Sequence, residues 1–235
     1  MSLNSSLNAK INNAKSQLDN AVAEYSLVTF ANSFGAEDMV LTDLIAKHAP
    51  DIEIFSLDTG RLPAETYDLM QKVKECYDIE VKTYFPDYHS VEAYIRKNGP
   101  NAFYESVELR KRCCFIRKVE PLKRALAGKK AWLTGLRREQ APTRERLPFS
   151  EWDGDHGLQK FNPLADWTLD NVWNYIRHFN VPYNALHDQH YPSIGCAPCT
   201  RAIAAGEDIR AGRWWWENPE TKECGLHPAK KAANN

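Results

Sequence analysis

The sequence predicts a doubly wound α/β domain with a mostly parallel sheet. Short runs rich in β-branched and aromatic residues alternate with stretches of helical periodicity between residues 26 and 134. A polar, glycine-containing loop follows three of these runs, and ligands of open parallel sheets bind at that edge. The chain has 235 residues and shows no internal repeat or linker. We therefore expect a single domain over residues 1–235.

The expected elements follow from periodicity in chain order. Apolar residues at helical spacing predict a helix over 7–24, within an N-terminal helical segment 1–24. Strands are expected at 26–31, 52–57, 79–85 and 131–134, and helices at 37–48, 64–77, 91–97, 103–127 and 169–179. Residues 142–157 are polar and are expected to form a loop over the site. Residues 212–235 have little regular pattern and are expected to form a mobile C-terminal tail.

The composition argues against several classes of protein. Thirty basic and 31 acidic residues leave a net charge of −1, which disfavours nucleic acid as the main partner. No apolar run approaches the roughly 18 residues that cross a bilayer, and the N-terminus lacks the apolar segment of a secretory signal. We expect a cytoplasmic protein with no membrane or nucleic-acid partner. Its cysteines are then metal ligands or catalytic thiols rather than disulfides.

Two close pairs of cysteines indicate a metal site, Cys113 with Cys114 and Cys196 with Cys199. Four thiolates suit one tetrahedral-thiolate site, which holds either zinc or an iron–sulfur cluster. A Cys₂His₂ zinc site with His187 and His190 is an alternative, but it leaves the first cysteine pair unexplained. Lys118 follows that pair closely and places a cation beside the thiolates.

Anion-binding features gather where the expected strands end. The loop 33–38 opens a helix and offers backbone N–H groups and the Ser33 hydroxyl to an anion. The loops 57–60 and 134–138 follow two further strands. Clustered arginines suit bidentate recognition of sulfate or phosphate, namely Arg137, Arg144, Arg210 and Arg213. The competing interpretations are a plain capped helix, independent turns and a solvated arginine face.

Cys224 stands apart from the other cysteines near the C-terminus. Lys222 and His227 lie close to it in sequence and favour its thiolate form. A thiolate on a mobile tail suits a nucleophile that enters a site and leaves it again to meet a second thiol. The competing interpretation is an incidental surface cysteine.

These motifs, in their order and spacing, resemble those of the assimilatory adenylyl-sulfate (APS) reductases, which group with the phosphoadenylyl-sulfate (PAPS) reductases. The resemblance runs from about Ser26 to His227. It departs from the family pattern at His190, where glycine is expected. The motifs that carry it are Ser33-Phe34-Gly35-Ala36-Glu37-Asp38, Leu57-Asp58-Thr59-Gly60-Arg61, Cys113-Cys114, Arg117-Lys118, Thr134-Gly135-Leu136-Arg137, residues 162–167, residues 195–200, residues 212–216 and Glu223-Cys224-Gly225-Leu226-His227.

The resemblance implies an adenine-nucleotide α-hydrolase-like fold and reduction of APS to sulfite and AMP. It implies a [4Fe–4S] cluster on the four paired cysteines and Cys224 as the catalytic nucleophile that forms an S-sulfocysteine. Thioredoxin or glutaredoxin would supply the electrons. Assembly into a homo-oligomer is left as an open alternative. The substrate-binding residues expected are Ser33, Gly35, Asp38, Leu57, Thr59, Gly60, Lys118, Gly135, Arg137, Arg144, Arg210, Arg213 and His227.

Three alternatives stay open. Reduction of PAPS, or dual use of APS and PAPS, differs only by the ribose 3′-phosphate. An ATP-pyrophosphatase-type tRNA thiolation enzyme would want a Ser-Gly-Gly-x-Asp-Ser loop and a basic surface, whereas the loop 33–38 lacks the second glycine and the final serine. A zinc-stapled nucleotide-binding regulator would not need Cys224.

Overall fold

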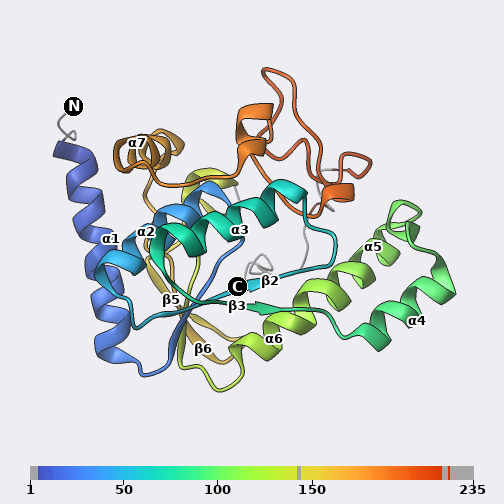
Figure 1. Cartoon of the computed structure of the whole chain (residues 1–235), viewed down its shortest axis with the longest axis horizontal. Helices are drawn as coiled ribbons and strands as arrows, with labels where there is room; N and C mark the ends of the chain where they lie inside the picture. Colours follow the sequence, from blue (N-terminus) through green and yellow to red (C-terminus); the bar gives the residue numbers. More distant parts are fainter. Residues whose placement is uncertain (1–4, 142–143, 219–221, 223–235) are drawn as a thin grey trace, which may run out of the picture.

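The computed structural model describes residues 5–141, 144–218 and 222. Its centre is a six-stranded sheet with the strand order β3-β2-β1-β4-β6-β5 (Figure 1). Neighbouring strands are parallel except the edge pair β5 and β6, which is antiparallel. The doubly wound, mostly parallel α/β fold is therefore confirmed. The strands are β1 (Val28–Ala31), β2 (Glu53–Leu57), β3 (Val81–Tyr84), β4 (Ala131–Leu133), β5 (Ser150–Asp153) and β6 (Leu158–Phe161).

Helices cover both faces of the sheet because successive strand residues point to opposite sides. Ile54 and Leu133 pack into one core with residues of α1, α2, α3 and α7. Phe55 and Trp132, their neighbours along the strands, pack into a second core with residues of α6. The helices are α1 (Ser5–Glu24), α2 (Ala36–His48), α3 (Ala64–Tyr77), α4 (Tyr88–Asn98), α5 (Val107–Cys114), α6 (Glu120–Leu126) and α7 (Leu169–Phe179).

Capping side chains fix where two of these helices begin. The Ser106 hydroxyl accepts a hydrogen bond from the Leu109 N–H at 3.1 Å and starts α5. Thr168 and Asn171 exchange two hydrogen bonds at the start of α7, each 3.1 Å long. A π-helical turn over 115–119 separates α5 from α6, so the single helix expected over 103–127 is divided. Such turns occur often at functional sites.

Two strands and part of the tail differ from the sequence-based expectation. The polar segment expected to be a loop contains β5, and β6 was not expected at all. Both are four-residue strands that gain their stability from pairing rather than from an apolar run: β5 is the edge strand, and β6 pairs with β4 and with β5. Trp214, placed in the expected mobile tail, is 1% exposed. The prediction for residues 223–235 falls outside the described residues.

The strand order reverses beside β1, whose neighbours are β2 on one side and β4 on the other. From β1 the chain steps outward to β2 and β3, and β4 then returns to the other side of β1, so the loops after β1 and β4 border a crevice at this point. That crevice is where an open α/β sheet binds ligands. Within the described part of the chain, no helix is long and apolar enough to cross a membrane.

Candidate functional site

A cavity of about 280 Å³ lies at the carboxyl ends of β1, β2 and β4. Its walls include the loops after these strands and the segment 192–195. Most of the residues expected to bind substrate border it. They are Ser33, Gly35, Asp38, Leu57, Thr59, Lys118, Gly135, Arg144, Arg210 and Arg213.

The loop after β1 is held in shape by Asp38. One oxygen of its carboxylate accepts hydrogen bonds from the Ser33 N–H at 2.7 Å and from the Ser33 hydroxyl at 2.6 Å. Burial raises the pKa of Asp38 to about 6, and the two bonds from Ser33 limit the rise. Gly35 occupies the N-cap position of α2, so the first N–H groups of that helix lie at the cavity.

Gly135 brings the loop after β4 against the loop after β1. A Cβ atom at this position would lie 2.1 Å from Oδ1 of Asp38 and 3.1 Å from Cβ of Glu37. Only glycine fits without displacing the carboxylate. The two loops that border the crevice at the reversal of strand order are therefore in direct contact.

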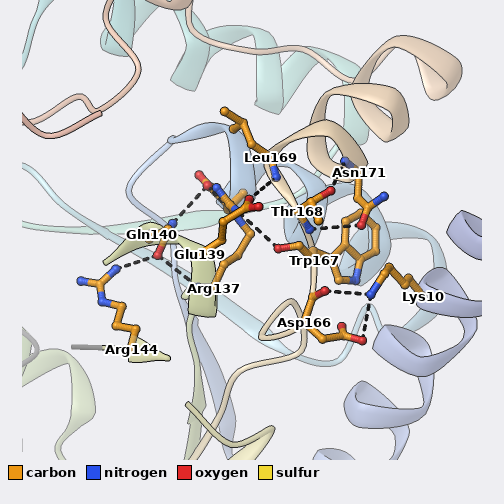
Figure 2. A network of polar contacts seen from close by, with 11 residues as sticks. Lys10, Arg137, Glu139, Gln140, Arg144, Asp166, Trp167, Thr168, Leu169 and Asn171 are labelled. Atoms are coloured by element: carbon orange, nitrogen blue, oxygen red, sulfur yellow. Dashed lines mark hydrogen bonds and ion pairs between the residues drawn. The ribbon is translucent and has the colours of Figure 1, made fainter. Parts of the chain in front are cut away.

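Arg137 does not border the cavity, contrary to the sequence-based expectation. Its guanidinium is 1% exposed and donates to Glu37 at 2.8 Å and to Glu139 at 3.0 Å (Figure 2). These contacts make it a structural residue beneath the site. The neighbouring Gln140 links this network to the cavity because it donates to Glu37 at 3.1 Å and accepts from Arg144 at 2.6 Å.

A second, smaller cavity lies beside the first and is bordered by all four cysteines of the two pairs. Three of them belong to a buried cluster that also contains Phe103 and Trp214, namely Cys114, Cys196 and Cys199; Cys113 packs against it. Within the described residues, no group of three His, Cys, Asp or Glu is arranged around one point as ligands of a single metal ion. This includes the Cys₂His₂ set considered with His187 and His190.

The cysteines differ in their electrostatic surroundings. Burial raises the pKa of Cys199 to about 12, and the neighbouring Cys196 adds to the rise. Burial also opposes ionisation of Cys196, but Lys118 and a hydrogen bond from Thr59 outweigh it and lower the pKa of that thiol. The Thr59 hydroxyl lies 3.2 Å from the Cys196 sulfur. One thiolate is thus favoured within an apolar, cation-lined chamber.

The two cavities share walls. Lys118 borders both of them. Trp214 borders the large cavity and packs in the cysteine cluster, and Thr59 borders the large cavity while touching Cys196. A ligand in the large cavity and a group on the cysteines would therefore be neighbours across one layer of side chains.

The remaining expected residues are Gly60, His227 and Cys224. Gly60, at φ +68°, lies on the side of the cysteines, where a Cβ would meet the Arg117 side chain at 3.4 Å; it does not border the large cavity. His227 and Cys224, the expected nucleophile, fall outside the described residues. His190, which replaces an expected glycine, has a left-handed φ of 66°, so this turn requires the conformation that glycine adopts most easily.

Several cavity residues were missed by sequence reasoning, among them Gln140, Trp132 and Trp214. Gln140 follows an arginine-rich motif, and its position three residues after Arg137 was the available signal. Trp132 lies inside a strand and resembles an ordinary core residue in the sequence. Trp214 adjoins Arg213, but the segment has no periodicity that would indicate a buried position.

The chain is similar to one protein family and to individual members of it. The model of the phosphoadenosine phosphosulfate reductase domain matches residues 27–202. An adenosine 5′-phosphosulfate reductase from Allochromatium vinosum is 58% identical over 210 residues, which cover 89% of this chain and 82% of that protein. Another from Burkholderia cepacia is 54% identical over 221 residues, with 94% and 88% covered.

The fold of the chain is also similar to those of solved structures. A crystal structure of phosphoadenylyl-sulfate (PAPS) reductase from Candida auris, a phosphate complex, superposes with a TM-score of 0.70 at 31% identity and covers 86% of this chain and 99% of that one. The FMN adenylyltransferase of Candida glabrata, in complex with FAD and pyrophosphate, gives a TM-score of 0.60 at 17% identity, with 99% and 83% covered. The second likeness concerns the nucleotide α-hydrolase-like fold alone.

Proposed function

The chain belongs to the adenosine 5′-phosphosulfate (APS) reductases of the phosphoadenosine phosphosulfate reductase domain family, and from that premise we propose that it reduces APS to sulfite and AMP with a thiol reductant. The observation that carries the proposal is the adjacency of two chambers. One is a cavity at the reversal of strand order, bordered by Lys118, Arg144, Arg210 and Arg213. The other is bordered by four cysteines, and Lys118 borders both.

The cationic wall suits the substrate. APS carries a phosphate and a sulfate joined in a mixed anhydride, and an incoming thiolate adds further negative charge. Guanidinium and ammonium groups offset that charge, most strongly in a site from which water is excluded. The N-terminal turn of α2 adds backbone N–H donors at the same edge. The adenosine portion would occupy the apolar part near Leu57.

In the first step the Cys224 thiolate attacks the sulfur of APS. A new S–S bond forms between Cys224 and the sulfonate group, the S–O bond to the phosphate breaks, and AMP leaves with that electron pair. AMP is a good leaving group, so the step needs no strong general acid. Cys224 lies seven positions after Glu217, the last residue but one of the described range 144–218. A span of seven residues reaches at most about 25 Å.

In the second step a thiolate of thioredoxin or glutaredoxin attacks the Cys224 sulfur. Sulfite leaves, and a mixed disulfide forms that the second thiol of the reductant resolves. The reductant is oxidised to its disulfide and two electrons pass to sulfur. This exchange supplies both electrons from thiols.

The cysteine chamber fits a [4Fe–4S] cluster on Cys113, Cys114, Cys196 and Cys199. Four thiols are the usual donor set of such a cluster. The Trp214 Nε1–H supports the fit, since it is buried beside these cysteines with no hydrogen-bond partner among the described residues, and sulfur is an acceptor. When bound, the cluster would supply a charged cross-link between α5 and the 196–199 segment rather than electrons.

Lys118 has a testable role in this scheme, because it borders both chambers. We expect Lys118→Ala to lower kcat/KM for APS about 10-fold or more, since it removes a charge-assisted contact to the substrate. The cluster absorbance should stay at the wild-type level. Unchanged kcat/KM in a variant with full cluster absorbance would contradict the role.

The proposal is tested by the intact mass of anaerobically purified protein after incubation with APS and no reductant. We expect the gain of one sulfonate group, located on Cys224 by peptide mapping, and its removal by reduced thioredoxin with release of sulfite. Cys224→Ser should bind APS but form no adduct. An adduct on another cysteine, or none from protein with full cluster absorbance, would overturn the mechanism.

PAPS reduction, alone or beside APS, is the second candidate, favoured by the structural likeness to the Candida auris PAPS reductase. The ratio of kcat/KM for the two substrates decides between them. We also propose that residues 1–235 form a single domain and that the protein is cytoplasmic. Partial proteolysis and sedimentation would test that organisation and the oligomeric state together.

A further inference from the structure

A buried ion pair joins the helix that carries two of the cysteines to the segment that leads to Cys224. Nε and Nη2 of Arg110 donate to the two carboxylate oxygens of Glu217 at 2.8 and 2.7 Å. The two side chains are 0% and 3% exposed. This is the bidentate arrangement that fixes direction as well as distance.

The same guanidinium touches two further groups. It lies over the Trp214 ring, 4.8 Å from the ring centre, and it donates to the sulfur of Cys114, one helical turn further along α5. The Glu217 N–H in turn donates to the Trp214 carbonyl at 2.9 Å, which closes a short turn over 214–217. Arg110 therefore contacts Cys114 of its own helix and both ends of the turn, Trp214 and Glu217.

The turn is tied to the other cysteine pair as well. The Trp214 N–H donates to the Cys199 carbonyl at 3.1 Å, and the Arg213 guanidinium also lies over the Trp214 ring, 4.7 Å from the ring centre. Trp214 borders the substrate cavity. The chain thus passes the cavity wall, makes this turn, and continues for seven residues to Cys224.

Stability alone does not account for a charge pair at this position. Two buried charges lose their hydration, and a well-packed apolar pair of similar volume is often as stable. Apolar contacts of Trp214 would hold the ring but leave the direction of the chain after it less defined. The bidentate pair fixes that direction at Glu217.

We propose that Arg110 is a positioning residue: with Glu217 it locks the 214–217 turn onto α5 and so sets the point and direction from which the segment carrying Cys224 leaves the cysteine chamber. The proposal rests on the proposed role of Cys224 as nucleophile. Breaking the pair should slow delivery of the thiolate to bound APS without weakening APS binding, because neither Arg110 nor Glu217 borders the substrate cavity.

The test compares R110M and E217Q with two matched controls in the full-length, cluster-loaded protein. R112M removes an exposed arginine of the same helix, and E207Q removes the partner of an exposed ion pair with Arg201. For each protein we would measure cluster absorbance, APS affinity, the single-turnover rate of sulfonation at saturating APS, and chymotryptic cleavage after residues 214–216.

For E217Q and R110M we expect the single-turnover rate to fall about 10- to 100-fold, the range that misplacement of a reacting group produces. APS affinity and cluster absorbance should change less than twofold, while cleavage after 214–216 should accelerate. R110K, which keeps the charge but not the fork, should recover part of the rate. The controls R112M and E207Q should match the wild type.

Sulfonation at the wild-type rate in E217Q, or equal losses in rate, affinity and cluster content, would overturn the proposal in favour of no role or a purely structural one. If the wild type itself forms no Cys224 adduct, the proposed function fails instead. The proteolysis arm then still decides whether the pair holds the turn, since unchanged cleavage in R110M and E217Q would refute the lock.

Discussion

Gly135→Ala tests the contact between the two loops that border the substrate cavity. The new Cβ would lie 2.1 Å from Oδ1 of Asp38, whereas ordinary contact begins at 3.4 Å. The carboxylate must therefore retreat by at least 1.3 Å, the difference between these distances. The other oxygen, Oδ2, accepts the bonds of 2.7 and 2.6 Å from the N–H and hydroxyl of Ser33, and because the carboxylate moves as one rigid group, the retreat of Oδ1 breaks or weakens both bonds.

The cost follows from the bonds lost. Hydrogen bonds to a charged group contribute about 1.5–3 kcal/mol each, so losing two lowers the free energy of unfolding by about 3–6 kcal/mol. In a domain of this length each kcal/mol shifts Tm by roughly 2–4 °C. We expect Gly135→Ala to lower Tm by about 10 °C and, because the loop with Ser33 borders the cavity, to weaken AMP binding.

A double-mutant cycle with Asp38→Ala gives the decisive measurement. Removing the carboxylate removes the overlap, and the remaining close neighbour, Cβ of Glu37 at 3.1 Å, needs to give only a few tenths of an ångström. Gly135→Ala should then cost less than about 1 kcal/mol in the Asp38→Ala background, so the two changes couple strongly. Additive losses in Tm, measured anaerobically to keep the proposed cluster intact, would refute the argument.

Three further predictions use the same site. Burial raises the pKa of Asp38 from 3.8 to about 6, so the folded state favours the protonated acid. The contribution of this protonation to the free energy of unfolding is complete below pH 4 and is lost as the pH rises to 6. The stability of wild type relative to Asp38→Asn should fall by about 3 kcal/mol across that window, as followed by unfolding at each pH. Arg137→Met should lower Tm because it breaks a buried ion pair, whereas Arg144→Met should raise KM for APS about 10-fold with Tm unchanged; the reverse pattern would refute the separation. Gly195→Ala should weaken APS binding in equilibrium titrations with cluster absorbance unchanged, because its Cβ would lie 2.3 Å from the Arg213 guanidinium. Wild-type affinity would contradict it.

The central strands and the loops of the site were predictable because local signals agreed with the fold. β1, β2 and β4 are apolar runs that end at polar, glycine-containing loops, and parallel strands bring such loops to one edge. Ser33 and Gly135 could be assigned to the site on that basis. β5 and β6 gave no such signal, since Ser150–Asp153 has a single apolar residue and Leu158–Phe161 includes Gln and Lys, and pairing decides their conformation.

The roles of the arginines could not be separated from the sequence. Arg137 and Arg144 belong to one basic motif, yet one is buried and one borders the cavity. What distinguishes them is Glu37, which lies 100 residues from Arg137 in sequence and 2.8 Å from it in space. A buried guanidinium that pairs with a partly buried carboxylate far away in sequence becomes structural, and no local pattern reports such a partner.

The backbone of the segment after Gly212 was also not predictable from local pattern. The run after Gly212 has no helical or strand period, and absence of a period predicts a mobile chain. Trp214 is nevertheless buried, with the Arg110 and Arg213 guanidinium groups over its ring and a left-handed φ of 43°. In a regular helix or strand, successive side chains point in fixed directions. The irregular turn over 214–217 instead lets the Trp214 indole contact the cysteines and border the cavity, while Glu217 pairs with Arg110. Order at Trp214 and Glu217 comes from paired buried groups rather than from periodicity, which is why the absence of a period misjudged this part of the segment.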